Sequence, residues 1–238
     1  MNQYVIIVAG GRGTRMRNAS ARVSSPEGEV LPKQFMDLGG LPVLMRTINV
    51  FERALTDPKI ILVLGKEIIP LWRDLCIQYN FHSPACSVAV GGEERFHSVR
   101  NGLALINEDA EAVVGVHDGV RPLVSEDVIR RAYHAAETAC GVVPVLKSVE
   151  SVRLLDDDGR SRAVNREKVM MVQTPQVFPL QVLRRAYEQP FSPSFTDDAS
   201  VVESAGFSIQ LVEGNRENIK LTTPADLLFA RALLKATQ

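Results

Sequence analysis

The sequence predicts an α/β fold with a mostly parallel sheet, and two observations support this. Short runs of β-branched residues alternate with longer segments whose apolar residues recur at the helical period, which is typical of βαβ units. The length of 238 residues permits one large α/β domain or two small ones, with a substantial core. Because no linker divides the chain, we expect a single domain over residues 1–238.

The elements follow from this alternation, in chain order. Strands are expected over 4–9, 60–65, 87–90, 112–117, 141–146 and 208–212. Helices are expected over 43–55, 67–79, 96–106, 126–138, 180–188, 198–205 and 224–236. The last helix has the clearest start, since Thr223 can cap it, Pro224 suits its first position and Asp226 completes a capping box.

Two regions interrupt the alternation. Residues 17–32 are small and polar, which predicts a mobile loop between two elements of a site. Within 147–172, Asp158-Gly159 stands between short apolar runs and predicts a hairpin turn. We expect a hairpin inserted there, between two strands of a parallel sheet, to project from the body, where it can reach another subunit.

Composition excludes several classes of function. The net charge of -1 leaves no basic excess for a general nucleic-acid or membrane-surface binder. The cysteines, Cys76, Cys86 and Cys140, are odd in number and lack C-x-x-C spacing, so we expect buried thiols in a reducing compartment. The four histidines show no metal-ligand spacing. No signal peptide or long apolar run is evident, and we expect a cytoplasmic protein.

The glycine-rich stretch 8–16, VAGGRGTRM, follows the first expected strand and suggests a phosphate-binding loop. A dinucleotide fingerprint is disfavoured, because Met16 replaces its third glycine and no acidic residue follows at the required distance. The Walker A pattern is absent. Two alternatives remain: a plain turn, or a loop whose backbone N–H groups wrap a nucleoside triphosphate while Arg15 adds charge.

Lys33 favours the triphosphate-binding alternative. It follows Pro32, which fixes the backbone, and it ends the segment that begins at the glycine loop. Both ends of this segment can therefore converge on one anion.

Seven motifs together resemble one family. In order they are AGGRGTRM (9–16), LPKQF (31–35), GGEERFHSV (91–99), VHDGVRP (116–122), QTPQVF (173–178), FTDDAS (195–200) and VEGNRENIKLTTPADL (212–227). The combination resembles the 2-C-methyl-D-erythritol 4-phosphate cytidylyltransferases of the non-mevalonate isoprenoid route. The resemblance spans nearly the whole chain. It implies a Rossmann-like domain of the nucleotidyltransferase type whose arm, 147–172, is exchanged within a homodimer.

The resemblance also implies a reaction. An oxygen of the acceptor phosphate attacks the α-phosphorus of CTP and pyrophosphate leaves, with Mg²⁺ bridging phosphate oxygens. Both reactants are anionic, so positioning and electrostatic stabilisation carry catalysis, and a phosphate dianion needs no general base. By resemblance Arg15 and Lys33 act on the triphosphate, while Arg166 and Lys220 position the acceptor phosphate.

Further roles are carried over by the same resemblance. The residues expected to contact the nucleotide are Ala9, Gly10, Gly11, Gly13, Gly92, Glu93, Ser98 and Gly119, and those expected to contact the acceptor are Asp118, Arg121, Ser148 and Thr174. Mg²⁺ would be held mainly by the CTP phosphates, with Asp118 either a metal ligand or a contact to substrate hydroxyls. We expect His117 to be packed or hydrogen-bonded rather than a base, and residues 196–198 to support the site, with a substrate contact as the alternative role of Asp197.

Other functions stay open at this point. Lys147-Ser148 stands where many relatives have Asp-Thr, which keeps a pentitol-phosphate cytidylyltransferase, such as one acting on ribitol 5-phosphate, as the alternative. A non-catalytic nucleotide sensor is disfavoured by the combined presence of the four cations assigned to catalysis. A nicotinamide-dependent oxidoreductase is disfavoured by Met16.

Overall fold

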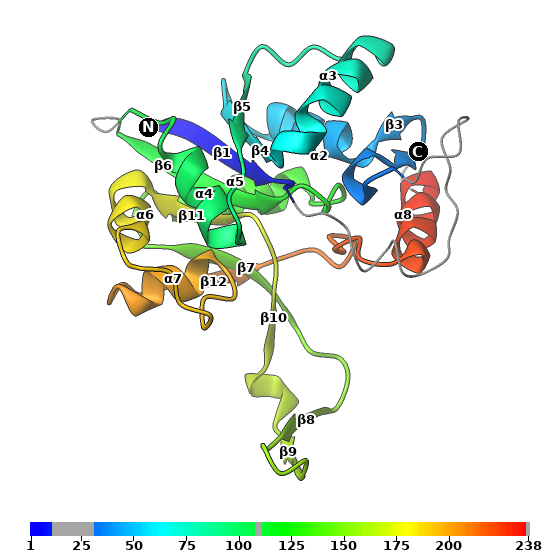
Figure 1. Cartoon of the computed structure of the whole chain (residues 1–238). Helices are drawn as coiled ribbons and strands as arrows, with labels where there is room; N and C mark the ends of the chain where they lie inside the picture. The colour runs from blue at the N-terminus through cyan, green and yellow to red at the C-terminus, as the bar shows by residue number, and fades with distance from the viewer. Residues whose placement is uncertain (11–30, 108–110, 237–238) are drawn as a thin grey trace.

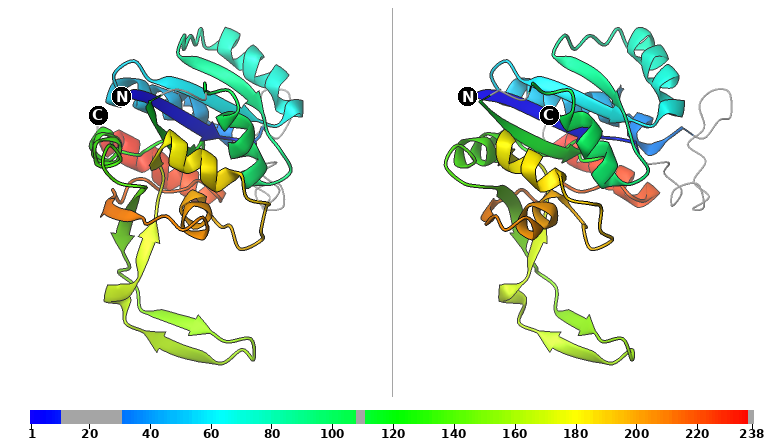
Figure 2. Two further views of the ribbon diagram at one scale, coloured as in Figure 1. Left: turned by 90° about the vertical axis from the view of Figure 1, so that its left-hand side faces the viewer. Right: turned by 60° about the vertical axis from the view of Figure 1, so that its left-hand side comes forward.

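The fold is a twisted, mostly parallel sheet covered by helices on both faces, and a two-stranded arm projects from it (Figures 1 and 2). The computed structural model describes residues 1–10, 31–107 and 111–236. The sheet order is β10-β7-β11-β6-β1-β4-β5, with β12 beside β7. The strands are β1 Asn2–Val8, β4 Lys59–Leu64, β5 Cys86–Val90, β6 Ala112–Asp118, β7 Val142–Lys147, β10 Met170–Val172, β11 Gln176–Pro179 and β12 Gln210–Glu213.

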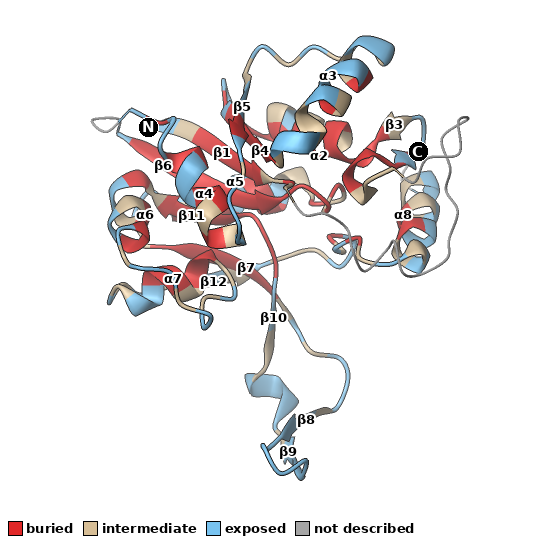
Figure 3. Cartoon of the chain, in the orientation of Figure 1, coloured by how far each residue is buried: buried red, intermediate tan, exposed pale blue. Residues whose placement is uncertain are grey.

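Alternate side chains of β1 supply two separate cores, one on each face of the sheet. Val5 and Ile7 pack with α2 Val43–Ala54, α3 Ile69–Gln78 and α5 Glu126–Ala135. Tyr4 and Ile6 pack on the other face with α4 Arg95–Leu103, α6 Leu180–Tyr187 and α7 Asp198–Ser204. Because both faces are covered, the central strands are almost continuously apolar and buried (Figure 3).

The six strands and seven helices expected from the alternation are all present. Their boundaries differ by up to three residues, since several ends form single turns instead of helix. α3 starts at Ile69 because Lys66–Ile68 form a 3-10 helix, η2. Two short strands, β2 Asp37–Leu38 and β3 Leu41–Pro42, were not expected.

The sheet is less parallel around β7 than the sequence predicts. β11 lies between β6 and β7 and runs antiparallel to both, and β10 runs antiparallel to β7. The prediction that the hairpin joins two strands of a parallel sheet is therefore wrong, because it connects the antiparallel pair β7 and β10. β10 and β11 were not expected because both are short. β11 also follows Pro175 and ends at Pro179.

The hairpin predicted at Asp158-Gly159 is confirmed. β8 Val152–Leu155 pairs with β9 Ser161–Val164, and Gly159 has a φ of 77°. A glycine suits this left-handed conformation, which other residues rarely adopt. The hairpin stands away from the sheet and is mostly exposed (Figures 1 and 3).

The predicted start of the last helix, α8 Pro224–Ala236, is also confirmed. Asp226 N–H donates to Thr223 Oγ1 at 3.3 Å, and Thr223 N–H donates to Asp226 Oδ2 at 2.7 Å. The three cysteines are free thiols but only partly buried, so the expectation of buried thiols is wrong. Among the helices that the structure describes, none is long and apolar enough to cross a membrane.

Candidate active site

The site lies where β1 and β6 end side by side. In a parallel sheet neighbouring strands end at the same edge, and Val8 is in register with Asp118. Gly119 N–H donates to the Val8 carbonyl at 2.9 Å. A Cβ on Gly119 would lie 2.8 Å from that of Ala9, so only glycine permits this close approach.

The segment that starts at the glycine loop returns to the same edge. A short 3-10 helix, η1 Lys33–Phe35, begins directly after Pro32. The buried Gln34 side chain donates to the Ala9 carbonyl at 2.9 Å. The end of the segment at Gln34 therefore lies beside Ala9, while the convergence of the glycine loop and Lys33 on one anion stays a prediction. Gly11, Gly13, Arg15, Met16 and most of the loop 17–32 lie outside the described residues.

Three cations surround the Asp118 carboxylate. Lys220 Nζ lies 3.0 Å and Arg121 Nε 3.2 Å from Asp118 Oδ2, while Arg95 Nε lies 3.6 Å from Oδ1. Burial alone would raise the pKa of Asp118, but the charges of Arg95, Lys220 and Arg121 hold it well below its usual range. The site therefore contains a carboxylate that is ionised at neutral pH, within an excess of positive charge.

Sequence reasoning did not name Arg95 as a site residue, although it lies in the GGEER motif. Its guanidinium forms a bidentate pair with Asp198, at 2.8 and 2.6 Å, and Tyr187 Oη donates to the same carboxylate at 2.7 Å. Burial works against the charge, but Asp198 and Asp118 raise the pKa of Arg95 above its usual value. This placement fits the supporting role expected for residues 196–198.

His117 is a neutral structural residue, as expected. Its Nε2 donates to the Arg121 carbonyl at 3.1 Å, so Nδ1 accepts from Thr174 Oγ1 at 3.0 Å. The Thr174 hydroxyl in turn accepts the Asp118 backbone N–H at 3.2 Å. Burial lowers the pKa of His117 to about 4. These linked hydrogen bonds fix the backbone at Asp118 and place the Thr174 side chain beside it.

The segment that carries Lys220 is held against the loop after β6. Arg121 Nη1 donates to the Asn218 carbonyl at 2.8 Å, and Leu221 N–H donates to the Val120 carbonyl at 2.9 Å. The buried Asn218 amide donates to the Thr174 carbonyl at 2.9 Å. These bonds join segments distant in sequence, and they bring Asp118, Arg121, Thr174 and Lys220 together.

The loop after β5 reaches the same edge of the sheet. Gly92 N–H donates to Ser98 Oγ at 3.1 Å. A Cβ on Gly92 would lie 2.4 Å from that of His97, so the tight turn requires glycine. Glu93 is exposed and Ser98 is buried. The glycine turns that follow β5 and β6, together with Ala9 and Gly10 after β1, thus leave backbone groups at one edge, which suits the wrapping of a nucleotide.

The structure does not bring Ser148 and Arg166 to this cluster within one chain. Arg166 Nη1 donates to the Val149 carbonyl at 3.0 Å, and Ser148 Oγ donates to the Glu150 carbonyl at 3.1 Å. With Lys147, they line a hollow of about 630 Å³ at the arm. Their described hydrogen bonds stay within the arm, so a second chain is needed if they act beside Asp118.

A protein-built metal site was not found in residues 1–10, 31–107 and 111–236, where no three His, Cys, Asp or Glu side chains gather. Asp118 lies at the end of β6, and its oxygens already contact three cations. This donor set fits a metal held mainly by a bound triphosphate rather than by the protein alone.

An open α/β sheet with glycine turns and a cationic cluster at its carboxyl edge fits an enzyme of the nucleotidyltransferase type. Comparison with known sequences makes the class specific. Residues 3–236 match the family model for 2-C-methyl-D-erythritol 4-phosphate cytidylyltransferase. The chain belongs to this family, whose enzymes are cytidylyltransferases.

Curated relatives and solved structures agree with this membership. The enzyme of that name from Bacteroides fragilis is 52% identical over 234 residues, covering 98% of this chain and 100% of the relative. The enzyme from Porphyromonas gingivalis is 45% identical, covering 98% and 97%. The 4-diphosphocytidyl-2C-methyl-D-erythritol synthase structure from Anaerococcus prevotii has a TM-score of 0.79 at 28% identity, covering 98% of both chains.

Proposed function

We propose that this protein transfers CMP from CTP to 2-C-methyl-D-erythritol 4-phosphate, giving 4-CDP-2-C-methyl-D-erythritol and pyrophosphate. The observation that carries the proposal is the Asp118 cluster, where Arg95, Arg121 and Lys220 converge beside the end of β1. Relatives 44–52% identical over nearly the whole chain bear the name of this activity, which favours this acceptor over ribitol 5-phosphate.

The cationic edge supplies what the reaction needs. The attacking phosphate and the triphosphate repel each other, so positive charge between them lowers the barrier. Lys33 and Arg15 are proposed to stabilise charge at the α-phosphate and the leaving pyrophosphate. Lys220 and Arg121 are proposed to hold the acceptor, with Asp118 fixing both cations in place. Since the attacking phosphate oxygen is already ionised, neutral His117 need not act as a base.

Mg²⁺ is proposed as the cofactor. When bound, it would neutralise phosphate charge and polarise the bond that breaks. The CTP phosphates would supply most of its ligands, and an Asp118 oxygen would have to leave an ion pair with Arg95, Arg121 or Lys220 to join them. Omission of the metal, or its chelation, should therefore abolish turnover.

A homodimer formed through the arm is also proposed, together with a cytoplasmic location. The arm exposes Leu154, Leu155 and Met171, which are 45%, 75% and 55% accessible. Arg166 and Ser148 belong to the same arm, where with Lys147 they line a hollow. Contact with the arm of a second chain would cover this apolar surface and deliver the two residues to the partner's site.

The testing experiment measures pyrophosphate release with Mg²⁺, each of the four nucleoside triphosphates, and either methylerythritol 4-phosphate or ribitol 5-phosphate. Release only with CTP and methylerythritol 4-phosphate is expected. Release with ribitol 5-phosphate alone would keep the CTP site and overturn the proposed acceptor. Absence of release in every pairing would contradict the enzymatic proposal.

A further inference from the structure

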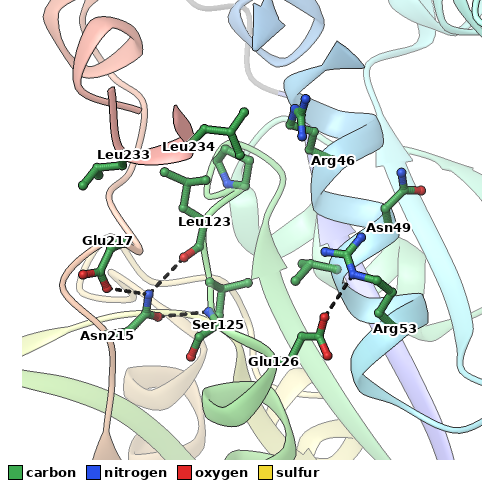
Figure 4. Close-up of a pocket in the computed structure, with 13 residues that line it drawn as sticks. Arg46, Asn49, Arg53, Leu123, Ser125, Glu126, Asn215, Glu217, Leu233 and Leu234 are labelled. Atoms are coloured by element: carbon green, nitrogen blue, oxygen red, sulfur yellow. Dashed lines mark hydrogen bonds and ion pairs between the residues drawn. The ribbon is translucent and has the colours of Figure 1, made fainter. Parts of the chain in front are cut away.

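A second hollow, of about 360 Å³, lies beside the loop that follows β6 (Figure 4). Its walls come from α2, residues 122–126, the segment 215–217 and the end of α8. Neither Asp118 nor Lys220 lines it. One side chain in its wall, Asn215, connects the loop to the segment that carries Lys220.

The Asn215 amide joins two parts of the chain. Its Nδ2 donates to the Leu123 carbonyl at 3.0 Å, and its Oδ1 accepts from Ser125 N–H at 3.2 Å. Nδ2 also donates to Glu217 Oε2 at 3.2 Å. Figure 4 shows these three contacts at the side of the hollow opposite α2. The segment is thereby fixed to the loop that carries Arg121.

The side chain of Gln173 binds the backbone of Asn215. Gln173 Nε2 donates to the Asn215 carbonyl at 2.9 Å, and Asn215 N–H donates to Gln173 Oε1 at 3.3 Å. Gln173 precedes Thr174 and is almost fully buried. Asn215 thus links the loop after β6, the Thr174 strand connection and the start of the Lys220 segment.

This segment needs such links because it lacks regular structure. After β12 ends at Glu213, residues 214–223 form neither helix nor strand. The Lys220 side chain is 43% exposed, so packing alone does not fix its ammonium group 3.0 Å from Asp118. Hydrogen bonds at Asn215 add to those at Asn218 and Leu221 in restricting where Lys220 can lie.

We propose that Asn215 is a positioning residue for the acceptor phosphate, acting through Lys220. An amide is required because one side chain must donate to Leu123 and accept from Ser125. A carboxylate at 215 would keep the second bond but repel the Leu123 carbonyl and Glu217. The inference rests on the proposed function, in which Lys220 binds the acceptor.

The first test compares steady-state kinetics of the wild type, Asn215→Asp and Asn215→Ala. The KM for methylerythritol 4-phosphate should rise about tenfold or more in both variants, while the KM for CTP stays within about twofold. Asn49→Ala is the matched control, since Asn49 lines the same hollow from α2. It should leave both KM values unchanged.

A double-mutant cycle with Lys220→Ala separates positioning from general damage. If Asn215 acts through Lys220, Asn215→Ala should have little further effect on acceptor KM once Lys220 is alanine. Fully multiplied losses would overturn the proposal, and so would equal rises in both KM values. A wild type inactive with this acceptor would refute the proposed function instead.

A variant at Gln173 tests the hydrogen bonds that hold the backbone of Asn215. Gln173→Glu keeps the acceptor for Asn215 N–H but removes the donor to its carbonyl, so acceptor KM should rise again. Thermal unfolding of each variant checks that the protein is folded. If every variant at Asn215 and Gln173 fails to fold, the residues stabilise the fold as a whole, and the positioning role is wrong.

Discussion

Two neighbouring residues at the end of β6 show how partners decide charge. His117 and Asp118 are both buried. His117 has hydrogen bonds that suit a neutral ring and a pKa lowered to about 4. Asp118 instead faces three cations, which overcome the cost of burial and hold its pKa low. Burial therefore keeps His117 neutral, whereas at Asp118 the facing cations outweigh burial and keep the carboxylate charged.

The depressed pKa of His117 predicts acid sensitivity. Since the folded state binds this proton less readily than the unfolded state, the free energy of unfolding should fall as pH drops from about 6.5 to about 4. The loss should be on the order of 3 kcal/mol. Urea unfolding of wild type and His117→Gln across this range measures it, and the variant should show a flatter profile.

Asp118 provides an internal contrast for that experiment. Its folded pKa is lowered, so its contribution is present above the ordinary value of 3.8 and is lost only below it. The stability contributed by Asp118 is therefore lost at lower pH than the stability contributed by neutral His117. An unchanged slope between pH 6.5 and 4 in His117→Gln would show that another group causes the acid sensitivity.

Arg95 is expected to be structurally essential. Arg95→Met leaves the buried Asp198 carboxylate with the Tyr187 hydroxyl but without its cation. Loss of one partner of such a pair costs about 3–5 kcal/mol. Denaturant unfolding should show this loss, and Arg95→Met with Asp198→Leu should recover part of it. Equal stability of single and double variants would contradict the pair's role.

At the scale of elements, local signals specify helix starts but not the partners of strands. The capping box at Thr223 and Asp226 is encoded within four residues and forms as predicted. β11 has no comparable local signal. It forms a strand because it lies between β6 and β7, where its backbone N–H and C=O groups pair with both strands.

The cap also gives a prediction. Thr223→Ala removes the Oγ1 acceptor of Asp226 N–H, and should cost about 1 kcal/mol of stability. Thr223→Ser is the matched control, because it keeps the hydroxyl. Thermal unfolding of the three proteins measures the effect. Equal losses for alanine and serine would mean that the methyl group, not the cap, stabilises this helix start.

At the scale of the whole molecule, the arm separates one part of the proposed site from the rest. Arg166 lies on the arm while Lys220 lies on the body, beside Asp118. In the proposed homodimer, the arm of one chain would complete the acceptor site of the other. Exposed apolar side chains on the arm are consistent with such a contact.

Mixed dimers test this arrangement. Arg166→Ala and Lys220→Ala chains should each be poorly active alone. Refolded together, they should regain about a quarter of wild-type activity, because half of the dimers would have one intact site. Each variant refolded by itself serves as the control. No recovery, despite verified mixed dimers by native mass spectrometry, would show that the arm does not act on its partner.

The sequence alone determined the α/β class, the expected strands and helices, the arm hairpin and the family. These depend on short-range periodicity, on turn chemistry and on motifs that can be recognised residue by residue. Lys33, Asp118, Arg121, Thr174 and Lys220 could be named because each lies in such a motif. The structure places the last four in one cluster.

Only the tertiary structure decided how those motifs meet. The Arg95–Asp198 pair joins residues 103 positions apart, and the Asn215 contacts join three separate segments. The antiparallel insertion of β11 is of the same kind. Such contacts form between segments that are distant in sequence and meet only in the folded chain. Local sequence patterns do not predict them, because each partner alone is an ordinary polar or apolar residue.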